Sequence, residues 1–374
     1  MQTIKMTNKL VKILCFFTLF YAQICTAEIR IAIVVPKTGE YKVWGDEIIF
    51  GAQTAIDEIK QKGGIKGKKL ELTSIDDTCS ENLAISTAQM LSVSSSIKPS
   101  LVIGPYCSNS FSEVAKIYSK AKIFQIVPST LNYHDTSLKY KGVMKLVSFK
   151  EQMGKDFFAF YNTKYAGFKT ALIYDNKTDG TKEVIHAIVD EFRKHGKNSL
   201  LKQYDLYNYK NLDSLASEIA SSEYKIVYLA GSPKKNAKII KKVSLINSDK
   251  IFITSKYTAT DTFFENASGY LDNVYFMALP SFENRPEFTE HLVNLRLRGI
   301  EFDGLNIYGY AAVKMWTDLV KDTGSLSYDK LANSIQTKKT SNVWKNSFFN
   351  NTSSKNPLHY MFYQYKNGEF ILSE

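Results

Sequence analysis

Three short segments carry the side chains best suited to chemistry, and each follows an apolar run typical of a buried strand. "PKTGEYKVWGD", with Trp44, follows "IRIAIVV"; "GPYCSNS", with Cys107 and Ser108, follows "SLVI"; and "VPSTLN" follows "KIFQI". In open parallel sheets, ligands bind at the carboxyl ends of the strands. The three segments therefore predict a shared binding site for a small ligand.

The chemistry expected at this site is recognition of an anionic group. Ser110 and Glu113 have capping-box spacing, so a helix should begin beside Cys107 and Ser108. Its free backbone N–H groups would favour a carboxylate or another anion. Trp44, at the rim, would form an apolar wall over the ligand. The alternative is that Trp44 packs against its own lobe.

Catalytic signatures are missing from the sequence. It has no GxSxG, no Walker GxxxxGK[ST], no HExxH, and no GxGxxG after the first strand. Its five histidines are scattered without metal-ligand spacing. Asp76 and Asp77 are adjacent on a strand and point to opposite faces, which suits a structural role. We expect no enzyme activity, no metal site and no cofactor.

Residues 1–27 have the features of a secretory signal peptide. "MQTIKMTNKLVK" holds three lysines and no acid, the apolar run "ILCFFTLFYAQIC" follows, and "CTA" precedes Glu28. The run is shorter than the ~20 residues of a membrane span. We therefore expect a soluble, periplasmic mature protein. Lipid attachment at Cys25 is disfavoured because Ile24 stands where a small residue is required.

Two cysteines, Cys79 and Cys107, remain after removal of this segment. In an oxidising compartment they favour one structural disulfide, and two buried free thiols are the alternative. A nucleophilic cysteine is disfavoured because no histidine lies nearby in the sequence.

The net charge of +11 falls to about +8 without the three signal lysines. The densest basic segment, "PKKNAKIIKK", reads as the solvated face of a helix. Nucleic-acid binding is not expected, because no basic segment is interleaved with stacking aromatics and no zinc pattern is present.

Strand-like and helix-like segments alternate regularly, which predicts parallel, doubly wound α/β sheets. The first helix should begin near Glu47, with Asp46 as its cap, and end at Gly63-Gly64. The alternation restarts after about residue 147, so the 374 residues suffice for two lobes. A hairpin should turn at Asn367-Gly368.

From about residue 28 onwards, the sequence resembles the periplasmic branched-chain amino-acid-binding proteins of ABC transporters, the leucine/isoleucine/valine-binding group. The resemblance is carried by "VWGDEIIFGAQTAIDEIKQKGGIKGKKLEL", "DDTC", "VIGPYCSNS", "IVPST", "ALIYD" and "YGYAAV". It is most specific in the first 110 mature residues, whereas the second lobe matches mainly in pattern.

The resemblance implies the type I periplasmic binding protein fold: two Rossmann-like lobes joined by three hinge crossings, with the ligand clamped between them. The first lobe would comprise residues 28–147 plus 278–355, and the second 148–277 plus 356–374. The resemblance also implies a disulfide between Cys79 and Cys107.

Ligand contacts follow from the same resemblance, residue by residue. Trp44 matches the aromatic residue that contacts the ligand, and Ser108 matches the serine that holds the amino-acid carboxylate. Tyr106 and Cys107 match the backbone beside that serine.

The residues that would receive the ligand ammonium match Ser129 and Thr130. The second lobe departs from the family pattern, because Lys256 stands where a glutamate commonly pairs with that ammonium. At an effective dielectric constant of ~20, two like charges 4 Å apart cost about 4 kcal/mol. Either Asp179 replaces the lost carboxylate and Lys256 turns away, or the ligand is not an ordinary neutral amino acid.

The function implied is that of a monomeric soluble receptor, which binds an amino acid or a related small polar solute and delivers it to the permease of an ABC importer. The alternative is a ligand sensor that docks on a membrane receptor or kinase without feeding a transporter. The fold expected for the two is the same.

Overall fold

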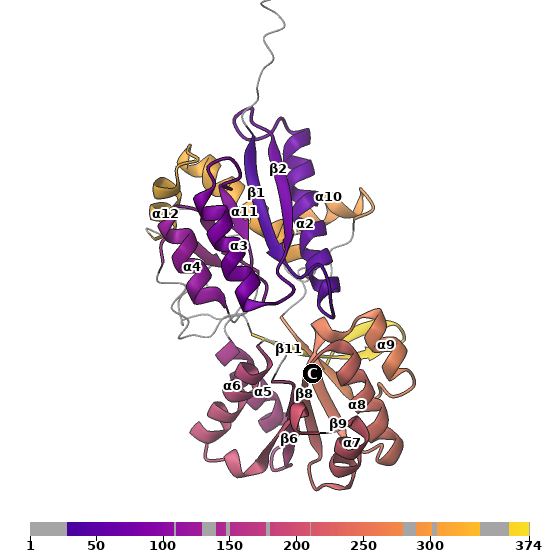
Figure 1. The fold of residues 1–374 in the computed structure, drawn as a ribbon. Helices are drawn as coiled ribbons and strands as arrows, with labels where there is room; N and C mark the ends of the chain where they lie inside the picture. The colour runs from indigo at the N-terminus through magenta and orange to yellow at the C-terminus, as the bar shows by residue number, and fades with distance from the viewer. Residues whose placement is uncertain are drawn as a thin grey trace, which may run out of the picture.

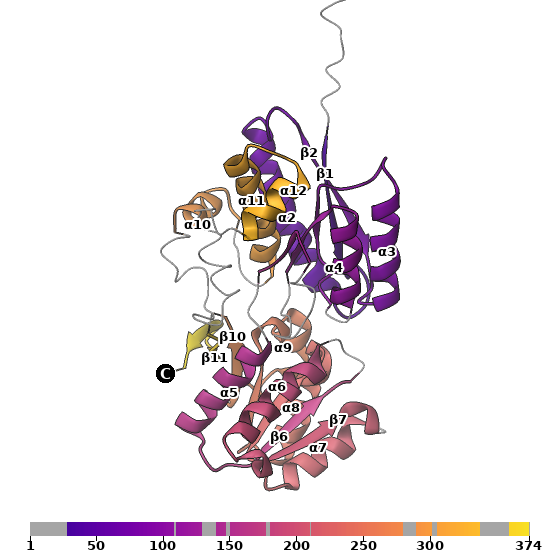
Figure 2. The same ribbon diagram turned by 90° about the vertical axis from the view of Figure 1, so that its left-hand side faces the viewer.

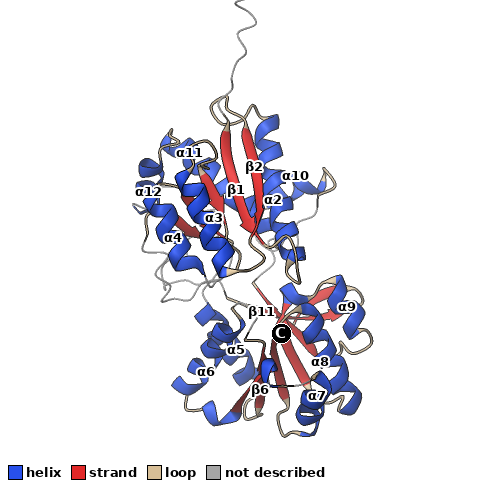
Figure 3. Ribbon diagram, in the orientation of Figure 1, coloured by secondary structure: helices blue, strands red, loops and turns tan. Residues whose placement is uncertain are grey.

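The computed structural model describes residues 28–107, 110–128, 140–146, 150–176, 180–209, 211–279, 289–300, 305–336 and 359–373. These segments form two α/β lobes stacked one above the other (Figure 1). Each lobe has a sheet with helices on both faces (Figure 3). The predicted fold class is confirmed. No helix among the described residues has the length and apolar character that a membrane span requires.

The first lobe contains a five-stranded parallel sheet in the order β2-β1-β3-β4-β5. Its strands are β1 Ile29–Val35, β2 Leu70–Asp76, β3 Leu101–Ile103, β4 Phe124–Val127 and β5 Val143–Lys145. Its helices are α2 Lys42–Gln61, α3 Glu81–Val93, α4 Phe111–Lys120, α10 Thr289–Arg296, α11 Asn306–Thr323 and α12 Tyr328–Gln336.

Strand β1 shows why this sheet needs helices on both faces. Ile31 and Ile33 pack into the core shared with α2 and α11, whereas Ala32 and Val34 pack into the core under α3 and α4. Successive side chains of a strand point to opposite faces. A run that is apolar at every position therefore lies between two helical layers.

The second lobe contains a seven-stranded sheet in the order β12-β11-β10-β9-β8-β6-β7. Its strands are β6 Thr170–Tyr174, β7 Leu201–Asp205, β8 Ile226–Ala230, β9 Ile251–Ser255, β10 Val274–Ala278, β11 Met361–Lys366 and β12 Glu369–Leu372. Its helices are α5 Lys150–Lys164, α6 Thr181–Lys194, α7 Leu212–Ser221, α8 Pro233–Ile246 and α9 Asp261–Ala267.

The terminal strands β11 and β12 form the hairpin expected at the end of the chain. They pair antiparallel with Lys366 opposite Glu369, and Asn367 and Gly368 between them have φ angles of 53° and 86°. Two consecutive positive φ angles are the requirement of a two-residue hairpin turn, and Asn-Gly meets it. The predicted turn is confirmed.

The chain passes between the lobes at three places. It leaves the first lobe between β5 and α5, returns between β10 and α10, and enters the second lobe again between α12 and β11. In Figures 1 and 2, the orange helices α10 to α12 accordingly lie with the indigo and purple first lobe, and the hairpin lies with the second. The residue limits given above for each lobe stay predictions.

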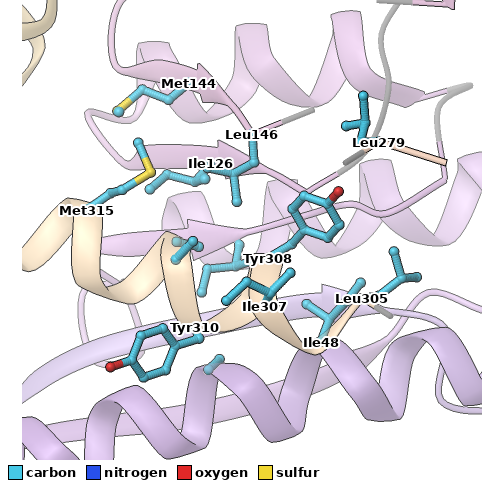
Figure 4. Packing of buried hydrophobic residues seen from close by; sticks show 14 of the residues in the cluster. Ile48, Ile126, Met144, Leu146, Leu279, Leu305, Ile307, Tyr308, Tyr310 and Met315 are labelled. Carbon is cyan, nitrogen blue, oxygen red and sulfur yellow. The ribbon is translucent and has the colours of Figure 1, made fainter. Parts of the chain in front are cut away.

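Helix α11 packs along α2 and also contacts strand β3, so that both helices cover the same face of the sheet (Figure 4). It crosses α2 so closely that only glycine fits at two positions. A Cβ atom on Gly309 would lie 1.9 Å from the Ile48 carbonyl oxygen, and one on Gly51 would lie 1.7 Å from the Asn306 carbonyl oxygen. Real Cβ atoms do not approach oxygen so closely, so these glycines permit the helix contact.

Helix α2 begins earlier than expected. It starts at Lys42, so Trp44 lies in its first turn, and Asp46 is a helical residue that pairs with Lys42. The predicted start near Glu47 and the cap at Asp46 were wrong. The early start brings Gly45 against the Pro36 carbonyl, where a Cβ atom would lie at 1.7 Å. Glycine, normally a poor helix residue, is what allows the extra turn to fit.

The capping box expected at helix α4 is not formed. Ser110 precedes the helix, but its side chain accepts no capping hydrogen bond, and its backbone is already helical. Capping normally requires an extended backbone at this residue. By contrast, Ser80 has an extended backbone, and its side chain accepts from the Leu83 N–H at the start of α3.

A disulfide joins Cys79 and Cys107, which are 28 residues apart. Closing a loop of this length should stabilise the fold by about 3.6 kcal/mol. We therefore expect a reductant to lower the melting temperature of the exported protein. The double variant Cys79→Ala, Cys107→Ala should melt lower and not respond to the reductant. Labelling of two thiols by an alkylating agent without reductant would contradict the bond.

Lys145 is fully buried at the end of β5. Burial lowers the pKa of its ammonium from 10.5 to about 7, although the Glu151 carboxylate opposes this shift. Burial of this lysine therefore lowers the free energy of unfolding by its full amount below pH 7, where the ammonium is charged in both states. The destabilisation decreases as the pH rises from 7 and is absent above 10.5, where the amine is neutral in both states.

Lys145→Met should therefore raise the free energy of unfolding by a few kcal/mol at pH 7 and by less at pH 10. Urea unfolding at the two pH values measures the difference. The exposed Lys141→Met is the control, expected to change stability at neither pH. A Lys145→Met protein that is no more stable than the wild type at pH 7 would refute the assignment.

Candidate functional site

A cavity of about 170 Å³ lies between the two lobes. Its first-lobe wall comes from segments that follow β1, β2, β3 and β4 and from the start of α11, namely Tyr41, Trp44, Cys79, Tyr106, Cys107, Pro128, Leu305 and Tyr308. Its second-lobe wall comes from the ends of β8 and β9 and the starts of α5 and α6, with Tyr360 from the last crossing. Both walls thus stand at the carboxyl ends of parallel strands, where such sheets bind ligands.

Trp44 connects the aromatic wall of the first lobe to the second lobe. Its ring stacks on Tyr41 with centroids 4.9 Å apart and lies 5.6 Å from the ring of Tyr106. Its indole Nε1 donates a hydrogen bond of 2.8 Å to the backbone carbonyl of Tyr257, which belongs to the second lobe. Trp44 therefore lines the cavity and also connects the lobes, a double role that neither sequence alternative included.

Tyr257 makes a second contact with the first lobe. Its hydroxyl lies 2.8 Å from the hydroxyl of Tyr308 on α11. Burial, reinforced by the neighbouring phenol of Tyr308, raises the pKa of Tyr257 well above its usual value. Both the backbone and the side chain of one residue therefore hold the two lobes together beside the cavity.

The loop after β2 has a structural function. The Asp76 carboxylate accepts hydrogen bonds from the backbone N–H groups of Lys37 and Thr78 and from the Thr38 hydroxyl. Burial alone would raise the pKa of Asp76, but these bonds lower it below its usual value. An ionised carboxylate that accepts from turn amides positions loops, as expected from the sequence, and the Cys79–Cys107 disulfide lies in the cavity wall beside it.

The structure brings together three of the residues proposed from sequence. Trp44, Tyr106 and Cys107 line one wall of the cavity. The other first-lobe candidates, Ser108, Ser129 and Thr130, lie outside the described residues, as does Asp179 of the second lobe. The contact of each of these residues with a ligand stays a prediction.

Lys256 does not line the cavity. Its ammonium lies 4.4 Å from the centroid of the Phe370 ring and 5.6 Å from that of Tyr363, on the hairpin side of the lobe. This position agrees with the alternative in which Lys256 turns away, and a contact of Lys256 with a ligand stays a prediction. The short turn after β9 explains this position, because Ser255 and Tyr257 on either side face the cavity while Lys256 rests on aromatic faces that attract a cation.

Lys150 is the cavity lysine that sequence reasoning missed. It is the first residue of α5, only 2% of it is exposed, and its Nζ lies 3.9 Å from the Glu183 carboxylate. Of the described residues in the cavity wall, Lys150 is the only lysine, and none is an arginine, an aspartate or a glutamate. The sequence feature that could have pointed to Lys150 is its position at the start of a helix that follows a lobe crossing.

Tyr360 was missed as well, because "HYMFYQY" reads as the first strand of a hairpin. Its backbone N–H donates 2.7 Å to the Asp156 carboxylate of α5, and Gln152 and His359 donate to the same carboxylate group. The phenol of Tyr360 lines the cavity and, at 5% exposure, has no hydrogen-bond partner among the described residues. Burial raises its pKa well above the usual value, so the phenol stays neutral.

Known proteins match both the sequence and the fold. Residues 28–369 match the family model described as periplasmic binding protein. An amino acid binding protein of Pseudomonas aeruginosa is 24% identical over 290 residues, which cover 77% of each chain.

Two solved structures show the same fold. The branched-chain amino acid transporter substrate binding protein LivJ of Streptococcus pneumoniae, in complex with isoleucine, gives a TM-score of 0.76 at 19% identity, covering 93% of this chain and 99% of that one. A solute binding protein of an R. palustris ABC transporter, in complex with benzoate, gives 0.74 at 19% identity, covering 92% and 95%.

These matches are to solute-binding proteins and not to enzymes, in agreement with the missing catalytic signatures. They also confirm the resemblance to the branched-chain amino-acid-binding group. The two lobes, the cavity between them and the match over nearly the whole described chain lead to one conclusion: this chain belongs to the periplasmic binding protein family.

Proposed function

We propose that this protein is the exported receptor of an ABC importer, which clamps an amino acid or a related small polar solute between its lobes and delivers it to a membrane permease. Residues 1–27 act as its signal peptide, and the mature receptor works in the periplasm as a monomer. It needs no cofactor.

One observation carries this proposal: the cavity has walls from both lobes and is bordered by direct bonds between them. Tyr257 of the second lobe accepts from Trp44 and contacts Tyr308, both of the first lobe. A solute in this cavity would be enclosed on two sides by rigid strand ends and helix starts. A hinge motion at the lobe crossings would open the site when the lobes separate and close it when they approach.

The relatives support a solute of amino-acid size. These relatives are described as binding amino acids, isoleucine or benzoate, all small molecules with a carboxylate. We prefer an importer to a sensor because two of these relatives are described as parts of transporters. Uptake of the identified solute by cells with and without the receptor distinguishes the two functions.

The first test is a thermal-shift screen of the mature protein against amino acids, amides, carboxylates and urea-like solutes. A solute present at 100 times its Kd should add ~2.7 kcal/mol to the free energy of unfolding. A solute that binds is then offered to intact cells. Binding without any receptor-dependent uptake would contradict the importer function.

Trp44→Ala should weaken binding of that solute by ~2 kcal/mol or more, because a large apolar wall is lost. Trp44→Phe keeps most of the wall but removes the hydrogen bond to Tyr257, so it separates the two contributions. Phe50→Ala, at a half-exposed aromatic of the same helix, is the matched control. Calorimetry measures each affinity, and an unchanged affinity in Trp44→Ala would show that Trp44 is not part of the ligand site.

Closure should also be visible in solution. We expect small-angle scattering to show a smaller radius of gyration with the solute than without it, since the open state has lost the bonds of Tyr257 to the first lobe. Tyr257→Phe removes the hydroxyl contact with Tyr308 and should shift the solute-free protein further towards the open form. An identical radius with and without bound solute would argue against a clamp.

A further inference from the structure

We propose that the outer side of helix α8 is a docking surface for a membrane rich in anionic phospholipids. This surface, which we call the α8 face, is formed by Lys234, Lys238, Lys241 and, at the helix end, Leu245 and Ile246. None of these residues lines the solute cavity, so the proposal goes beyond the binding of a solute.

The α8 face points away from the core of the second lobe. Helix α8 packs between α7 and α9 on one face of the sheet (Figures 1 and 2). Its core residues are Ala237, Ile239, Ile240 and Val243. Lys234, Lys238 and Lys241 recur at positions i, i+4 and i+7, the spacing of neighbours on one side of a helix. They lie on the side opposite the core residues, where Lys234 and Lys241 are exposed.

The charge of α8 is unlike that of the other described α-helices, because α8 alone among them has no acidic residue. Two of its lysines are used within the lobe, since Lys235 pairs with Asp175 and Lys242 pairs with Asp213. Among the described residues, the side chains of the three lysines of the α8 face have no ion-pair or hydrogen-bond partner. Their positive charge is therefore available to an external anion.

Helix stability does not account for this arrangement. Lys234 and Lys235 lie in the first turn, where the partial positive charge of a helix N-terminus repels cations and no acidic residue is present. The last turn, where a cation would stabilise the helix, has none. It instead exposes Leu245 and Ile246, at 62% and 59%. Like charges at helical spacings of three and four residues repel as well. A role outside the fold explains the lysines better.

A membrane fits the α8 face better than a protein partner does. Protein interfaces are enriched in arginine and aromatic residues and depleted in lysine, whereas α8 has five lysines and neither an arginine nor an aromatic residue. Lysines beside exposed aliphatic side chains are typical of surfaces that bind anionic membranes. The ammonium groups attract lipid phosphates, and the aliphatic side chains enter the interfacial layer. Docking through this face would concentrate the protein at a membrane surface.

The test is co-sedimentation of the mature protein with vesicles. One set contains equimolar phosphatidylglycerol and phosphatidylcholine, and the other contains phosphatidylcholine alone. We expect binding to the anionic set only, and weaker binding at higher salt because salt screens the attraction. The triple variant Lys234→Gln, Lys238→Gln, Lys241→Gln should bind about a hundredfold more weakly, from roughly fivefold per lysine. Its melting temperature should match that of the wild type, since the three side chains make no contacts that stabilise the fold.

Two further variants separate the α8 face from net charge. The control Lys69→Gln, Lys98→Gln, Lys120→Gln removes the same charge from three exposed lysines of the first lobe and should bind within about twofold of the wild type. The double variant Leu245→Ser, Ile246→Ser should bind about tenfold more weakly and keep its salt dependence, because it loses only the apolar contact.

Three outcomes would overturn the proposal. Equal losses in the two lysine variants would show that net charge alone attracts the protein. Equal binding to neutral and anionic vesicles would exclude recognition of lipid charge. Absence of vesicle binding would also contradict it, and a loss of solute uptake by cells in the α8 variant would then indicate an acidic protein partner instead. The proposed function is tested separately, because the solute screen contains no membrane.

Discussion

The arrangement of this protein depends on how one residue, Tyr257, connects two separately folded lobes. Its carbonyl accepts from the Trp44 indole, and its hydroxyl meets that of Tyr308. All three side chains belong to the cavity wall. The hydrogen bonds that hold the lobes together are therefore next to the solute. A solute that fits poorly would disturb these bonds and so disfavour the closed state. Binding and conformation are coupled here by contact and not through a distant network.

Much of the fold could be predicted from the sequence because its signals are local. The apolar run of β1, the alternation of strands and helices, and Asn367-Gly368 each reflect short-range chemistry. The start of α2 could not be predicted, because Gly45 alone disfavours a helix. The sequence does not reveal that the Pro36 carbonyl lies against this position and requires a glycine there. Likewise the α2–α11 contact joins residues more than 250 positions apart, which no local pattern reveals.

The residues of the candidate site show the same difference between local signals and long-range contacts. Trp44, Tyr106 and Cys107 follow strands of the first lobe; Trp44 was found from that position, and Tyr106 and Cys107 from the family resemblance. Lys256 also follows a strand, but the direction of its side chain depends on Phe370, which joins the sheet from the end of the chain. Lys150 and Tyr360 lie at lobe crossings, where position in the fold, and not residue pattern, brings a side chain to the cavity.

The crossing of α2 and α11 through Gly51 and Gly309 also determines the order in which the lobes can be completed. Helix α11 belongs to the first lobe but follows β6 to β10 of the second lobe in the chain. During synthesis, the buried face of α2 therefore stays without its partner until residue 323 has been made. Domains usually fold in the order of their synthesis. Here the N-terminal lobe can finish only after most of its neighbour exists, which keeps the nascent chain incompletely folded for longer.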